Sequence, residues 1–136
     1  MRQHRIALVS FALLALAVTL PAQAKDILLG KWNITLTRDD DSPKVGEKEF
    51  KDALNFTGGN FESEKFKKEG FDATTYEEDT RGVQTIAFTV KPKSDKEGET
   101  KWTGTAVANE ISGDLTWTKK DGTEVKYTFK GTRAEK

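Results

Sequence analysis

The residue types that could carry out chemistry are few in this chain. It contains no Cys, and its one His, His4, lies in an apolar leader at the N-terminus. Without His or Cys, the chain after the leader cannot build a Ser-His-Asp or Cys-His nucleophile, a His general base, or a nitrogen- or sulfur-ligated metal site. Carboxylate, Lys, Tyr and Ser chemistry remain, and no spacing singles out a pair of such residues. We therefore expect a protein that is not an enzyme and that holds no metal and no cofactor.

Two acidic runs could in principle supply ligands to a cation. Asp39-Asp40-Asp41 could offer oxygen atoms to calcium, but the run lacks the alternate-position spacing and the distal Glu of a calcium loop. Glu77-Glu78-Asp79 has the same defect. Both runs are typical of solvated loops.

The aromatic residues suggest a second kind of site, one that binds rather than reacts. Trp102, Gly104 and Ala106 share one face of a predicted strand, and Gly113 lies on the inward face of the next. Small residues beside large aromatic ones leave local room, which could form a ligand cavity or accommodate a neighbouring ring in a packed core. Both interpretations stay open. The candidate ligand-binding residues are Trp32, Trp102, Trp117, Tyr127 and Arg133.

Period-two alternation of apolar and polar residues sets the elements that would position these side chains. It predicts seven strands, at 30–37, 53–57 (beginning near Ala53), 60–62, 83–91, 99–108, 110–119 and 123–132. Residues 71–77 are predicted to be extended as well. Loops are expected over 38–49 and 93–98, and a turn over 78–82. About eight short antiparallel strands predict an all-β fold, a small up-and-down barrel of the lipocalin or avidin kind, because closure removes exposed sheet edges. An open β-sandwich of two four-stranded sheets is the alternative.

Turn geometry fixes the pairing of the last three predicted strands. A two-residue connection around Asn109 brings the apolar faces of the first two together. A three-residue loop over 120–122, with Gly122 in the left-handed conformation, pairs Trp117 with Val125 and sets Gly113 opposite Phe129. Large residues would then cover glycines, which slightly favours a filled barrel.

One segment interrupts the β pattern. Ser63 can cap a short helix over 63–69, and Gly70 suits the position after its end. We expect this helix to lie over one end of the barrel with Phe66 inward. Asp52 breaks the apolar alternation of the preceding strand, and for that reason the strand is predicted to begin near Ala53.

Gly30-Lys31-Trp32 at the head of the first strand resembles the Gly-x-Trp of the lipocalin and calycin superfamily of β-barrels. The resemblance implies that Trp32 closes the floor of a barrel and that an Arg near the chain end packs across it. Arg133 stands at the corresponding place, just after the last predicted strand. In length, the chain is more similar to an avidin-type barrel.

The leader and the charge balance bear on location and partners. Residues 1–24 show a basic start, an apolar run and an Ala-x-Ala site, so they are predicted to be a cleaved signal peptide, leaving 25–136 as a single domain. That domain has 20 basic and 22 acidic residues, which gives no electrostatic case for nucleic acid or an anionic membrane. We expect a secreted or periplasmic monomer that is not inserted in a membrane after cleavage.

Two functions follow as expectations. The first is binding of a small apolar molecule in the barrel. The alternative is a protein-interaction or inhibitor module of the cell envelope with a filled barrel, in which loops 38–49 and 92–98 at one barrel end form the working surface.

Overall fold

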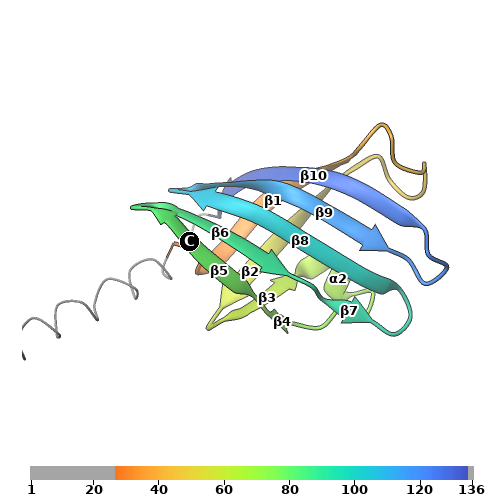
Figure 1. Cartoon of the computed structure of the whole chain (residues 1–136), viewed down its shortest axis with the longest axis horizontal. Coiled ribbons are helices and arrows are strands. Elements are labelled where there is room, and N and C mark those ends of the chain that lie inside the picture. The colour runs from red at the N-terminus through yellow and green to blue at the C-terminus, as the bar shows by residue number, and fades with distance from the viewer. Residues whose placement is uncertain (1–26, 135–136) are drawn as a thin grey trace, which may run out of the picture.

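The computed structural model describes residues 27–134, which form a barrel of antiparallel strands with one short helix (Figure 1). The predicted signal peptide over 1–24 lies outside the described residues. The elements, in chain order, are β1 Gly30–Arg38, β2 Glu49–Thr57, β3 Asn60–Ser63, α2 Glu64–Lys67, β4 Thr74–Thr75, β5 Glu77–Gly82, β6 Thr85–Val90, β7 Lys93–Ser94, β8 Gly98–Val107, β9 Glu110–Thr118 and β10 Glu124–Arg133.

The sheet forms a nearly closed barrel, and its two end strands are joined through the chain. Its ten strands run in the order β4-β3-β2-β1-β10-β9-β8-β6-β5, with β7 beside β8. β4 and β5 stand at opposite ends of this order, yet only Tyr76 separates them in sequence. One extended segment therefore pairs with β3 along its first part and with β6 along its second. Counting that segment once and leaving β7 aside, the wall has the eight positions that were predicted, and the barrel rather than the open sandwich is confirmed.

The pairing predicted for the C-terminal strands is also confirmed. Val107 pairs with Glu110 across a two-residue turn at 108–109. Trp117 pairs with Val125 and Gly113 with Phe129. Gly122 has a φ of +93°, the left-handed conformation that the 120–122 loop requires.

Three of the predicted boundaries were wrong. β2 begins at Glu49 rather than near Ala53, because the carboxylate of Asp52 has hydrogen-bond partners inside the fold. The turn expected over 78–82 is strand β5; the turn lies one step later, at 83–84, so the strand expected from 83 begins at Thr85. β5 is exposed along most of its length, so it carries no apolar alternation to reveal it. The expected loop over 93–98 holds β7, which pairs with Gly98 and Glu99.

The short helix forms where it was predicted. The Ser63 hydroxyl accepts a hydrogen bond from the Phe66 amide at 3.1 Å, which caps the helix. Gly70, with a φ of +98°, redirects the chain after it. α2 thus places Phe66 over one end of the barrel, as expected.

The interior is mainly apolar. It is built by the inward-facing residues of the strands together with Leu28, Phe66 and Phe71, which come from outside the sheet.

The two ends of the barrel differ in the segments that they contain. The Trp32 end holds residues 27–30 and the turns at 58–59, 83–84 and 108–109, and the α2 end holds α2 and the loops 39–48, 91–97 and 119–123.

Candidate functional site

The Trp32 end is closed by a stacked pair. The Arg133 guanidinium lies 4.2 Å from the centre of the Trp32 ring. Arg133 also donates hydrogen bonds to the carbonyl oxygens of Leu29, at 2.7 Å, and Ile27, and to the side chain of Asn109 at 3.2 Å. The Trp32 indole donates to the Leu28 carbonyl at 2.9 Å. The packing of Arg133 across the Trp32 ring, which the Gly-x-Trp resemblance implied, is therefore confirmed.

These contacts seal the barrel floor. The chain over 27–29 is tied to both members of the pair, and Leu28 and Trp32 have no exposed surface. Burial lowers the pKa of Arg133 from its usual value, because desolvation disfavours the charged form. The planar fork of donors compensates by satisfying several carbonyl groups at once.

The middle of the barrel is packed with aromatic rings. The Trp102 ring centre lies 5.3 Å from that of Phe61, 5.5 Å from Phe129 and 5.8 Å from Phe66. The side chain of Trp102 is completely buried. Ring separations of this size are those of favourable aromatic contacts, although the buried Trp102 indole N–H has no hydrogen-bond acceptor among the described residues.

The glycines that could have left a cavity do not. A Cβ atom added at Gly104 would lie 2.9 Å from the Phe88 ring and 3.0 Å from the Phe129 ring. At Gly113, it would lie 2.8 Å from Phe129. The room beside both glycines is therefore taken by rings of the same core.

The α2 end is closed by Phe66. This side chain is 1 % exposed and its ring centre lies 5.0 Å from Trp117 and 5.5 Å from Phe71. Phe50 contacts both Phe66, at 6.4 Å, and Tyr127, at 5.3 Å. Phe66 acts as a stopper in the mouth of the barrel.

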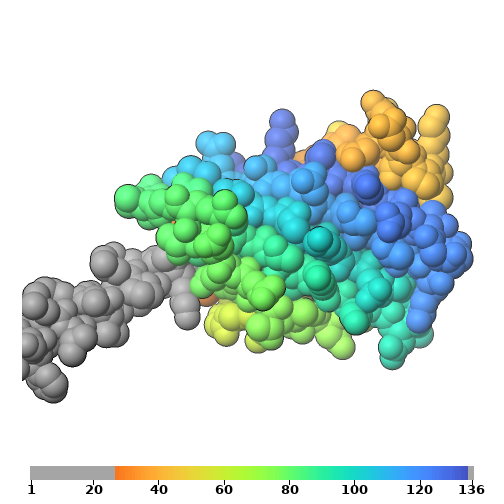
Figure 2. Space-filling view, viewed as in Figure 1, coloured from red at the N-terminus to blue at the C-terminus, as the bar shows by residue number. Residues whose placement is uncertain are grey.

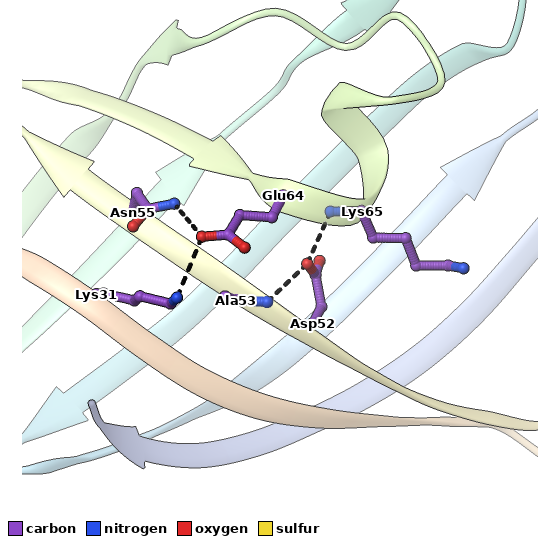
Figure 3. A network of polar contacts seen from close by, with 6 residues as sticks. All are labelled: Lys31, Asp52, Ala53, Asn55, Glu64 and Lys65. Carbon is purple, nitrogen blue, oxygen red and sulfur yellow. Dashed lines mark hydrogen bonds and ion pairs between the residues drawn. The ribbon is translucent and has the colours of Figure 1, made fainter. Parts of the chain in front are cut away.

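Asp52 anchors the segment that carries this stopper (Figure 3). Its carboxylate accepts hydrogen bonds from the amide of Lys65, at 2.9 Å, from the amide of Ala53, at 2.7 Å, and from the hydroxyl of Ser63. Burial raises the pKa of Asp52, although these three hydrogen bonds act to lower it. A strand residue of inward parity is thus used to hold the first turn of α2.

A second carboxylate in the same region is exposed. Glu64 accepts a hydrogen bond from Asn55 at 3.1 Å and pairs with Lys31 at 3.5 Å (Figure 3). The Asn55 hydrogen bond, followed by the charge of Lys31, lowers the pKa of Glu64. Because both partners of the ion pair face solvent, it contributes little to stability.

The five candidate binding residues do not surround one cavity. Trp32 and Arg133 form the floor, Trp117 and Tyr127 lie near the stopper, and Trp102 fills the space between. Hollows of about 680 Å³ and 560 Å³ lie on the outer wall instead, the first over Thr35, Ser112 and Lys130 and the second beside α2. The sequence analysis missed Asp52, whose place within an apolar alternation was the signal of a buried polar partner.

Two loops at the α2 end are held in place by hydrogen bonds. In loop 39–48, Arg38 donates to the Gly46 carbonyl at 2.8 Å, and Ser42 accepts from the Lys126 amide at 2.6 Å. At the β7 turn, Ser94 accepts from the amide of Glu97 at 3.2 Å, and the Glu97 carbonyl accepts from the Trp117 indole at 2.9 Å. Both loops are therefore tied by hydrogen bonds to neighbouring strands.

Neither acidic run forms a metal centre. Over 27–134, no group of three or more His, Cys, Asp or Glu side chains is arranged to hold a metal ion. The same residues include no helix with the length and hydropathy needed to cross a membrane.

The fold defines a class, a small antiparallel β-barrel whose inward side chains form an apolar core. No protein-family model and no curated protein matches the chain. Among solved structures, a redesigned β-barrel is similar at 16 % sequence identity, with a TM-score of 0.43 over 83 % of this chain and 96 % of that one. Membership of the lipocalin and calycin superfamily stays a prediction.

Proposed function

We propose that residues 25–136 form a secreted or periplasmic interaction module of the cell envelope, which contacts a protein partner through its outer surface. The observation that carries this proposal is the packing of the interior. Trp32, Trp102 and Phe66 follow one another from floor to mouth, and each is at most 1 % exposed. A barrel that is closed at both ends offers its recognition groups on the outside.

The working surface we propose is the α2 end. Loops 39–48 and 93–98 lie there together with α2, at the right of Figure 1. Binding is favoured by loops that are already ordered, because less conformational entropy is lost on association. Val45, which is 38 % exposed in the first loop, supplies an apolar contact among the charged residues of this end.

Site-specific crosslinking tests the proposal. A photo-reactive amino acid is placed at Val45, at Lys96, or as a control at Lys130, which is exposed on the outer face of β10. Each protein is then irradiated in envelope extract with and without excess unlabelled protein. We expect one protein partner to crosslink through Val45 and Lys96, to be displaced by the unlabelled protein, and to be absent from the Lys130 sample. Equal crosslinking at all three positions would contradict the proposal.

The small-molecule function gives a different outcome. Stoichiometric uptake of a fatty acid or an apolar dye, with quenching of tryptophan fluorescence, would favour ligand binding. Such uptake requires Phe66 or its neighbours to leave the interior, since the space beside Gly104 and Gly113 is already filled.

A further inference from the structure

Strand β5 has a partner on one side only. Glu77–Gly82 pairs with β6, and among residues 27–134 no strand pairs with its other edge. The β3–β4 pairing ends just before it, at Thr75, and the Tyr76 amide makes a last hydrogen bond to the Gly59 carbonyl at 3.2 Å. The backbone donors and acceptors along this edge are therefore open to another strand.

The edge is also accessible. The β5–β6 hairpin projects from the Trp32 end of the barrel, at the left of Figures 1 and 2. Every residue of β5 except Glu78 is exposed, and Val83 at the tip of the hairpin is 96 % exposed. The β5 edge can therefore be approached from solvent.

The acidic charge of the β5 edge favours a basic partner segment. Glu77, Glu78 and Asp79 are acidic, and the single basic residue, Arg81, is already paired with Asp79 at 2.9 Å. A second copy of the chain would set one acidic strand against another, and directly opposed like charges destabilise a strand pair. A basic segment would be attracted.

The side chain of Glu78 gives a second reason to expect a basic partner. It pairs with Phe88, whose side chain is in the core, so Glu78 lies on the inward face of the sheet at its open edge. One oxygen of its carboxylate is shielded from solvent and has no hydrogen-bond donor among the described residues. A buried acceptor without a donor is costly, and a Lys or Arg side chain on an added strand would satisfy it.

We propose that β5 is a docking edge for an extended, basic segment of a partner protein, which adds a strand to the sheet. Backbone hydrogen bonds give such complexes their affinity and alternate side chains give their specificity. The register shift between Thr80 and Gly82 limits regular pairing to Glu77–Thr80. The inference rests on the proposed function in taking a protein as the partner, and it adds a second surface at the opposite end from loops 39–48 and 93–98.

A blocked hexapeptide that alternates Lys with Val or Thr is the probe, titrated into the mature protein and followed by amide NMR. We expect saturable shifts and slowed hydrogen exchange confined to β5 and its hairpin. The same peptide with alternate amides N-methylated keeps its charge but loses the donors, and it should bind at least tenfold more weakly. Equal binding of the two peptides would overturn the proposal, because it would show attraction by charge alone.

Two variants locate the contact. Glu78→Gln removes the unsatisfied charge with little change in shape and should weaken binding of the unmethylated peptide about tenfold. Glu124→Gln, on the exposed outer face of β10, is the matched control and should leave binding unchanged. Equal loss in the two variants, absence of binding at millimolar peptide, or a dimer of the free protein with protected β5 amides would each contradict the proposal. Crosslinking through Val45 tests the α2-end surface separately, so either proposal can fail alone.

Discussion

Substituting Gly104 with Ala tests how closely the core packs against β8. Gly104 has no positive φ, so alanine is not strained by the backbone. The added methyl group would lie 2.9 Å from the Phe88 ring, 3.0 Å from the Phe129 ring and 2.7 Å from the Ser112 carbonyl oxygen. Overpacking of this kind costs about 1–3 kcal/mol. Loss of glycine freedom in the unfolded chain returns about 0.4–1 kcal/mol.

We therefore expect Gly104→Ala to lower the free energy of unfolding by about 1–2 kcal/mol, measured by urea denaturation with an unchanged m-value. Gly82→Ala is the matched control, since a Cβ there meets only Thr85 atoms at an ordinary 3.8 Å, and it should change stability by at most about 0.5 kcal/mol. Adding Phe88→Leu should recover part of the loss at Gly104 beyond simple additivity. A Gly104→Ala protein more stable than the parent would refute the packing argument.

Three further predictions concern the closures. Arg133→Met removes the donors to the Leu29 and Ile27 carbonyls and should cost about 2–4 kcal/mol by urea denaturation; a change below about 0.5 kcal/mol would show that the stack does not seal the floor. Phe66→Ala should cost about 3–5 kcal/mol, whereas exposed Lys67→Ala should be nearly neutral, and similar effects of the two would contradict the stopper role. Burial raises the pKa of Asp52 in the folded protein above 3.8. The free energy of unfolding of the parent, relative to that of Asp52→Asn, should therefore rise as the pH falls through the folded pKa toward 3.8. Denaturation at stepped pH measures this difference, and a fall would contradict burial as the cause.

The strands of the barrel could be predicted wherever one face of a strand is buried and the other is exposed to solvent. β1, β9 and β10 alternate in this way, and the pairing of Trp117 with Val125 followed from turn parity alone. Ser63 likewise marked the start of α2 correctly, since capping depends on local chemistry, whereas α2 ends at Lys67 and Gly70 turns the chain three residues later.

The errors fall where local pattern and tertiary position disagree. β5 is an exposed edge, so nothing in its alternation distinguishes it from a turn. Asp52 was predicted to lie outside the strand because it interrupts the apolar alternation. Its hydrogen-bond partners, Ser63 and Lys65, lie on elements whose positions depend on the whole fold. Whether the glycines opened a cavity depended on where the Phe88 and Phe129 rings point, which no single strand determines.

The central claim is that the lumen contains no room for a ligand. Diffraction from a crystal of residues 25–136 under xenon pressure tests this claim most directly. Xenon occupies apolar cavities that remain dry in solution. A filled barrel predicts no xenon site among Trp32, Trp102, Phe129 and Phe66. A xenon atom beside Trp102 would contradict the claim and return the lumen to consideration as a binding site.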